Sequence, residues 1–127
     1  MKKLPYQVLP SAEKTIFVAD DGAYGGAHKY EATNCRGFNN GVTDYDEHYY
    51  SHQTIQFVQK KDDGTIVPGL QSEQLVYILL DRHEKLNARF PSPQNEQMIT
   101  GLKMFIAACE ERVKDRIDRG VMGDLKK

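Results

Sequence analysis

Three arginines lie close together near the end of the chain, at Arg112, Arg116 and Arg119. On a helix Arg112 and Arg116 share one face, where like charges repel each other by about 0.2–0.5 kcal/mol. Asp115 is placed to pair with Arg112, whereas Arg116 meets only arginines, a valine and a glycine at helical spacing. We therefore expect the anion for Arg116 to come from elsewhere, and a planar guanidinium suits phosphate oxygens. The alternative is a solvated helix end whose cations favour the macrodipole.

Acidic and histidine residues form a second candidate group, in the first half of the chain. They could hold a metal ion, but no two of them share a recognised ligand motif. No serine lies in a nucleophile-elbow context, and neither cysteine has a histidine beside it in the sequence. We expect the acidic and histidine residues to lie in a solvated loop. We expect the protein as a whole to be a binding protein rather than an enzyme. The alternative is a small hydrolase of nucleotide signals that would use His28, His48 or His52 with Asp44 or Glu47.

A glycine-rich stretch occupies residues 20–28, with Gly22, Gly25 and Gly26 close together. Such a stretch lets the backbone approach another group closely. It matches neither the P-loop nor the dinucleotide-binding fingerprint, because the required lysine or the strand-to-helix context is missing. A hairpin loop is expected here, and a phosphate cradle is the alternative.

The arginines are expected to stand on the second of two long helices. For the first helix, apolar residues recur at steps of three and four from Leu75 to Phe90. Ser72 is the expected N-cap, because a serine oxygen accepts from the free N–H groups of the first turn. Pro91 ends this helix, since it disfavours helical geometry at the residue before it.

A second helix is predicted to start at once, with Ser92 as N-cap and Pro93 in the first turn, and to run to about Arg119. Gly120 is placed as the left-handed residue that ends it. The short connection predicts antiparallel neighbours. The second helix is too long for the first to cover, so its far end must meet something else. We expect an oligomer that buries the apolar residues of that end, Val113, Ile117 and Val121.

The residues before position 72 are expected to form an antiparallel sheet. Runs of β-prone residues bounded by turn formers predict strands at 6–9, 15–19, 28–32, 35–38, 42–45, 54–60 and 65–67. Within residues 54–60, Ile55 and Phe57 are expected to face a core and Gln56 to face solvent. The predicted fold class is α+β, a single domain over 1–127 with a sheet part (1–71) and an antiparallel two-helix hairpin (72–127).

Composition restricts the partners of this chain. Its 127 residues suffice for one modest core. The net charge is -1, and basic and acidic residues are evenly mixed along the chain. The sequence therefore predicts no basic surface for a DNA or RNA polymer, so a bound nucleotide should be small. Cys35 and Cys109 form no disulfide or zinc framework, which fits a reduced cytosol. No apolar stretch is as long as that of a signal peptide or a membrane span. No metal or cofactor is expected.

The helical part resembles the hairpin domain of phage anti-defence sponges. The matches are Ser72-Glu73-Gln74-Leu75, Asp81-Arg82-His83, Lys85-Leu86-Asn87, Phe90-Pro91-Ser92, Asn95-Glu96, Glu111-Arg112-Val113-Lys114-Asp115-Arg116 and Arg119-Gly120-Val121-Met122-Gly123. The preceding segments Gly25-Gly26-Ala27-His28 and Gly37-Phe38-Asn39-Asn40-Gly41 are similar to the first type of Thoeris anti-defence protein, rather than to the smaller, all-helical anti-CBASS sponge.

The resemblance implies a non-enzymatic viral protein that sequesters glycocyclic ADP-ribose made by bacterial TIR-domain proteins. The downstream effector then never meets its activator, and Thoeris immunity is blocked in the host bacterial cytoplasm. Proteins of this group also assemble into dimers and hexamers. Some hold the cyclic di- or trinucleotides of CBASS immunity in separate pockets.

The resemblance also implies site residues. Ligand-contacting arginines fall on Arg112 and Arg116, and an asparagine at the start of the second helix falls on Asn95. An aromatic that stacks on the adenine and a basic residue from the sheet are implied too, for which Phe90 and Lys60 are the candidates.

Two further expectations concern assembly. Asn95 and Arg116 stand about 30 Å apart along one helix, so a ligand that touches both would need two subunits. The remaining alternative is a purely structural phage protein, in which the arginines meet Glu110 or Asp118 of a neighbouring chain.

Overall fold

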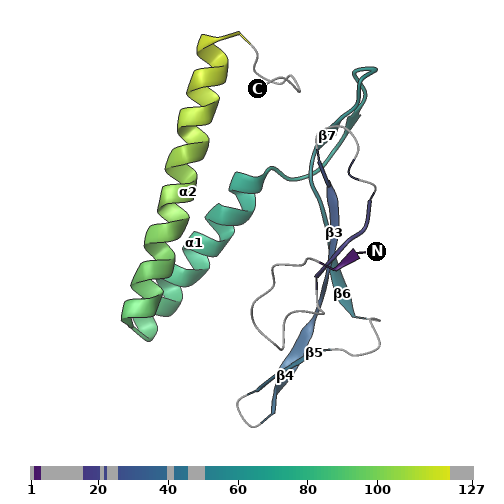
Figure 1. Ribbon diagram of the computed structural model, residues 1–127. Helices are drawn as coiled ribbons and strands as arrows, with labels where there is room; N and C mark the ends of the chain where they lie inside the picture. Colours follow the sequence, from purple (N-terminus) through teal and green to yellow (C-terminus); the bar gives the residue numbers. More distant parts are fainter. Residues whose placement is uncertain are drawn as a thin grey trace. The chain divides into compact units, whose positions relative to one another are not determined.

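The β-prone runs and the helical repeat of the sequence form separate parts of the protein in a computed structural model, which describes residues 2–3, 16–20, 22, 26–39, 42–45 and 51–120. The chain divides into two units, Met1–Gly69 with the strands and Leu70–Lys127 with two helices (Figure 1). An antiparallel sheet followed by a helical hairpin confirms the predicted α+β class. That the chain forms a single domain stays a prediction.

The main sheet has four antiparallel strands in the order β1-β2-β3-β6. Their bounds are β1 (Lys2–Lys3), β2 (Ile16–Val18), β3 (Lys29–Thr33) and β6 (His52–Gln56). Tyr30 lies opposite Ile55 in the register, and the ring of Tyr30 meets that of Phe57 edge to face at 5.8 Å. The strands predicted at 15–19 and 28–32 are confirmed, whereas the one at 6–9 lies outside the described residues.

A separate hairpin pairs β4 (Cys35–Asn39) with β5 (Val42–Tyr45), as the Asn-Asn-Gly turn signal predicts. The register shifts between Cys35 and Gly37. Gly37 has φ +151°, which a side chain would strain, so glycine suits the irregular position. This hairpin forms a two-stranded sheet of its own.

The single strand predicted at 54–60 is wrong, because it is divided between two sheets. β6 ends at Gln56, and β7 (Gln59–Lys60) pairs instead with β8 (Ile66–Val67). The chain at Gly69 approaches this break closely, since a Cβ there would lie 2.5 Å from the carbonyl carbon of Phe57. Gln56 is half-buried rather than solvent-facing, and its Nε2 donates to the carbonyl of Phe57 at 2.8 Å.

The turn between β7 and β8 uses the predicted Asp-Asp-Gly sequence. Gly64 has φ +86°, and the N–H of Thr65 donates to Oδ1 of Asp63 at 2.8 Å. Hydrogen bonds from the Thr65 side chain and backbone hold the pKa of Asp63 below its ordinary value. A lowered carboxyl pKa stabilises the folded turn above the unfolded pKa, and this contribution is lost as pH falls through the folded pKa.

The helices are α1 (Ser72–Arg89) and α2 (Pro93–Asp118). Ser92 caps α2 as predicted, because its Oγ accepts from the N–H of Asn95 at 3.0 Å, and Gly120 follows the helix with φ +70°. The predicted cap Ser72 is wrong by one residue, since Gln71 is the N-cap and its N–H donates to Gln74 Oε1 at 2.7 Å. Neither helix is long and apolar enough to span a bilayer.

The core of the hairpin lies between the two antiparallel helices. Val76 on α1 and Ile99 and Ile106 on α2 are its buried apolar residues. α2 has 26 residues and α1 has 18, so 8 residues of α2, about 12 Å, run on past the start of α1. The expected overhang is therefore present.

His83 lies on the buried side of α1, half-buried, with an Nδ1 that has no hydrogen-bond partner in the described part of the chain. Leaving a buried polar atom unbonded costs about 1–3 kcal/mol. We expect His83→Leu to raise the free energy of unfolding by about 1 kcal/mol in urea titrations, and the exposed Arg82→Leu to change it little. A destabilised His83→Leu protein would contradict this interpretation.

Candidate ligand site on the helical hairpin

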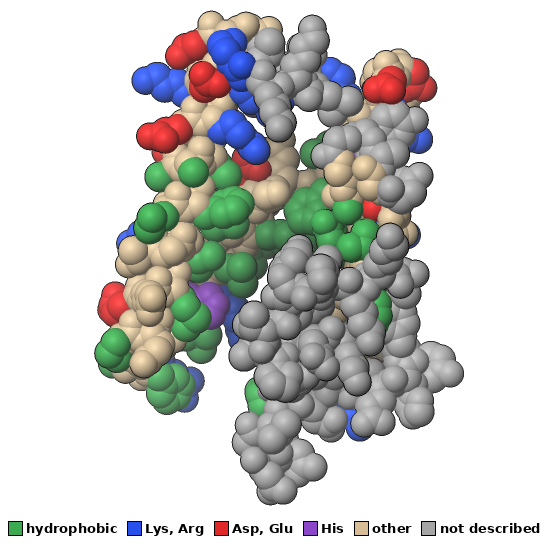
Figure 2. Space-filling model, in the orientation of Figure 1, with side chains coloured by type: hydrophobic (Ala, Val, Ile, Leu, Met, Phe, Trp, Pro, Cys, Tyr) green, Lys and Arg blue, Asp and Glu red, His purple; other side chains and the backbone are tan. Residues whose placement is uncertain are grey.

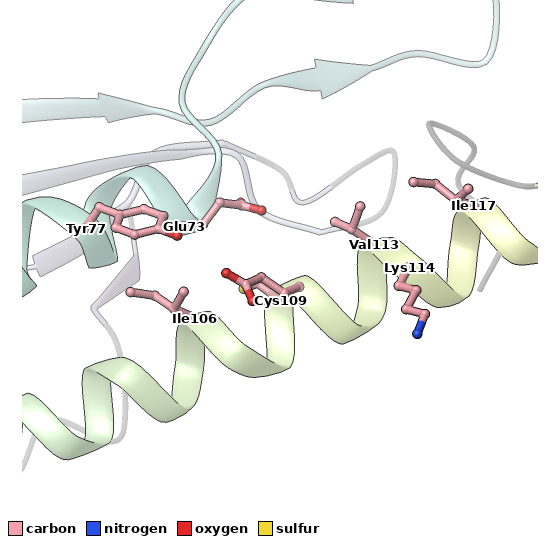
Figure 3. Close-up of a pocket in the computed structure, with 8 residues that line it drawn as sticks. Glu73, Tyr77, Ile106, Cys109, Val113, Lys114 and Ile117 are labelled. Atoms are coloured by element: carbon pink, nitrogen blue, oxygen red, sulfur yellow. The ribbon is translucent and has the colours of Figure 1, made fainter.

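An apolar groove lies where α2 begins to run past α1. Its volume is about 340 Å³. Tyr77 of α1 lies across from Ile106 of α2, and Val113 and Ile117 continue the same side of α2 past the start of α1 (Figure 3). The remaining lining residues are Glu73, Cys109, Glu110 and Lys114. An apolar floor with charged groups at its edges can take a ligand that is partly flat and partly ionic.

Two of the arginines flank this groove on α2. Arg112 and Arg116 each directly precede a lining residue, Val113 and Ile117, so the turn of about 100° per residue puts both arginines along one edge. Arg112 is exposed and Arg116 is half-buried. The charged residues of this segment gather around the last turns of α2 (Figure 2). The sequence correctly placed the two arginines on one helical face.

The ion pairs of this segment differ from the expectation. Asp115 pairs with Arg119, with Oδ2 3.1 Å from Nε, and not with Arg112 as predicted. Arg116 makes an interaction of its own within the chain. Arg116 is therefore not without a partner, and an anion supplied to it by another molecule stays a prediction. A role in phosphate binding stays a prediction for both Arg112 and Arg116.

Phe90 and Asn95 come together at the turn between the helices. The Nδ2 of Asn95 donates to the carbonyl of Phe90 at 2.9 Å. Phe90 is 62% exposed, and the guanidinium of Arg89 lies 5.3 Å from the centroid of its ring. An aromatic ring and an amide are both side chains that can contact a nucleotide. The amide N–H of Asn95, however, is already bonded to the backbone carbonyl of Phe90.

The predicted site residues fall into three groups. Phe90 and Asn95 stand at the turn, whereas Arg112 and Arg116 stand near the other end of α2, about 30 Å away along the helix. Lys60 belongs to the other unit, on β7, where it is half-buried and makes an interaction within the chain. The hairpin of one chain therefore does not gather its four predicted residues around one ligand.

The alternative sites in the sheet unit receive little geometric support. His28 precedes β3 and His52 opens β6, at opposite ends of the antiparallel β3–β6 pair, so the two imidazoles do not share a site. Glu47 and His48 lie outside the described residues, as does the side chain of Asp44. In the described part of the chain, no group of three or more His, Cys, Asp or Glu is arranged to hold a metal.

Two described backbone amides of the glycine-rich stretch are hydrogen-bonded within it. The carboxylate of Asp20 accepts from the N–H of His28 at 2.7 Å and from the N–H of Gly22 at 3.3 Å. Amides that are bound to a carboxylate do not serve a phosphate, so a phosphate cradle is disfavoured for the part of this stretch that the structure describes.

Sequence reasoning missed several residues of the groove and the turn, namely Glu73, Tyr77, Arg89 and Lys114. Tyr77 carries a usable signal, because it lies four residues after Glu73 on one helical face. The partner face on α2 depends on which residues of α2 lie opposite the start of α1, which no local pattern shows. Neither a scan against protein-family models nor a search of curated proteins finds a match for the chain.

Proposed function

We propose that this protein is a non-enzymatic sponge that binds and holds a small signalling nucleotide, glycocyclic ADP-ribose. In this role it is a phage protein that acts in the cytoplasm of an infected bacterium and blocks Thoeris immunity. The resemblance of the hairpin to anti-defence sponges supplies the identity of the ligand. Cyclic di- or trinucleotides held in separate pockets belong to the same proposal.

The observation that carries the proposal is the pairing of an apolar groove with two arginines along its edge. A cyclic ADP-ribose has a pyrophosphate and a flat adenine. Guanidinium groups bind phosphate oxygens with charge-assisted hydrogen bonds, and the apolar lining around Tyr77 and Ile106 suits a flat ring. Neither metal chemistry nor a nucleophile is needed for retention.

A complete site requires more than one chain in this proposal. The turn with Phe90 and Asn95 and the end of α2 with Arg112 and Arg116 are too far apart for one small nucleotide. An antiparallel second copy would bring its turn to this chain's arginines. The same contact would cover the exposed Ile117, which a single chain leaves 60% exposed.

Retention and release of the ligand test the proposal directly. Purified protein is mixed with glycocyclic ADP-ribose, freed of unbound ligand, denatured, and the released compound is chromatographed. We expect the intact ligand at about one equivalent or less per chain. An altered compound would mean a hydrolase, and no retained compound would mean a structural protein. Either result overturns the sponge.

We expect an oligomer at micromolar concentration in sedimentation velocity, because burial of side chains such as Ile117 is worth about 1.5–3 kcal/mol each. Ile117→Ser should shift the distribution toward monomer. Met104→Ser is the matched control, since Met104 is 68% exposed on another face of α2 and should leave the distribution unchanged. A monomeric wild-type protein would rule out the composite site.

A further inference from the structure

The turn between α1 and α2 is held by side chains on both sides of it. Asn87 Nδ2 donates to Glu96 Oε1 at 2.7 Å, and the N–H of Ser92 donates to Asn87 Oδ1 at 3.2 Å. Asn87 therefore ties the last turn of α1 to the start of α2. These bonds join residues up to nine positions apart, so they fix the path of the chain between the helices.

Phe90 is the first residue of this turn, and both of its backbone polar groups are bonded. Its N–H donates to the carbonyl of Leu86 at 2.7 Å, and its own carbonyl accepts from Asn95 Nδ2 at 2.9 Å. Pro91 follows and restricts the backbone of Phe90 further. The backbone polar groups are bonded while the residue as a whole is 62% exposed. A flat surface held this way loses little freedom when it binds a ligand.

Arg89 adds a cation to this surface. Its guanidinium lies 5.3 Å from the centroid of the Phe90 ring, within the distance of about 6 Å at which a cation is attracted to an aromatic face. The side chain of Arg89 is itself exposed, so its donors remain accessible to a ligand. A planar guanidinium beside an exposed ring presents a stacking surface and a phosphate-binding group within one turn.

We propose that Arg89 contacts the nucleotide together with the Phe90 ring, and that Asn95 is a positioning residue that acts through Phe90. The inference rests on the proposed function for the identity of the ligand. The adenine stacks on the open part of the ring, while Arg89 donates to the phosphate groups of the same nucleotide. Asn95 contributes by holding the Phe90 carbonyl rather than by touching the ligand.

Calorimetry with glycocyclic ADP-ribose tests the role of Arg89. We expect Arg89→Gln to weaken binding by about five- to thirtyfold, because it removes the charge and the cation–π contact. Arg89→Lys should recover only part of the loss, since an ammonium cannot stack or bind in a planar fork. The control is Arg82→Gln on the same helix, which should bind within about twofold of wild type. Equal affinity of Arg89→Gln and wild type overturns the contact and leaves the proposed function intact.

A double-mutant cycle tests the role of Asn95. Asn95→Ser removes the amide donor and should weaken binding in the wild-type background. In a Phe90→Leu background, the same change should weaken binding by less than about twofold, because the ring that Asn95 positions is already gone. Losses that simply add would show that Asn95 touches the ligand itself and would overturn the positioning role.

Adenosine monophosphate, followed by the NMR signals of the Phe90 ring, separates this inference from the proposed function. We expect shifts of these signals in wild type that are strongly reduced in Arg89→Gln. If glycocyclic ADP-ribose is not retained but these shifts appear, the sponge function is overturned, whereas nucleotide binding by Arg89 and Phe90 is supported. If neither compound binds at the turn, both are overturned.

Discussion

Arg116→Ala is expected to lower the affinity for glycocyclic ADP-ribose by about 10- to 150-fold. A hydrogen bond to a charged group contributes about 1.5–3 kcal/mol, and a factor of ten in affinity is about 1.4 kcal/mol. Arg116 is half-buried at the edge of the groove, where a phosphate contact is less screened than at the surface. Calorimetry on the purified variant measures the loss.

The fold should tolerate this change. Removing a cation four residues from Arg112 relieves like-charge repulsion of about 0.2–0.5 kcal/mol, which offsets part of the interaction that Arg116 makes in the chain. We expect the free energy of unfolding to stay within about 1 kcal/mol of wild type. Arg119→Ala is the matched control, because Arg119 is paired with Asp115 and should bind ligand within about threefold of wild type.

The structural alternative predicts a different pattern for the same variant. If Arg116 meets a carboxylate of a neighbouring chain, its removal leaves that carboxylate unpaired and weakens the oligomer. Sedimentation and thermal unfolding without ligand would then show dissociation and a lower Tm. Unchanged ligand affinity together with loss of the oligomer would show that Arg116 serves assembly rather than ligand binding.

Ile106→Ala should have the largest effect on stability, lowering the free energy of unfolding by about 2–4 kcal/mol. Ile106 is only 9% exposed and is one of the buried residues between α1 and α2, so truncation removes apolar contacts and leaves a cavity. Urea unfolding followed by helical circular dichroism measures the loss in the absence of ligand. Met104→Ala, on an exposed side chain of the same helix, should change the free energy by less than about 0.5 kcal/mol.

A small change in the free energy of unfolding for Ile106→Ala would point to a different source of stability. The hairpin would then draw its stability from contacts between chains rather than from Val76, Ile99 and Ile106. Repeating the titration at several protein concentrations distinguishes the two cases, because only subunit contacts make the midpoint concentration-dependent.

The helical hairpin was largely predictable from sequence, since its signals are local. The step of three and four residues, Ser92 with Pro93, and Gly120 mark the elements directly. The start of α1 was missed by one residue because glutamine at position 71 is not a usual cap, and its fit depends on Gln74. The break between β6 and β7 was missed because the alternation of apolar and polar residues runs on through it, and the close approach of Gly69 to Phe57 is a contact between residues far apart in the strand pattern.

The candidate site was less predictable than the fold. The helical period put Arg112 and Arg116 on one face, but Asp115 has an arginine within helical reach on either side. The structure selects Arg119, and sequence spacing alone does not decide between the two. The groove depends on the exact residue at which α1 begins opposite α2, and the contact of Asn95 with Phe90 depends on the shape of the turn.

The short connection between α1 and α2 has a kinetic consequence. Only three residues separate the helices, at 90–92, so the contacts of the hairpin join parts of the chain that are near in sequence. Such local contacts form fast, whereas β3 must wait for β6, which begins about 20 residues later, before it can pair. During synthesis the sheet leaves the ribosome before the hairpin. Counted from its own emergence, however, the hairpin should need less time to fold than the sheet.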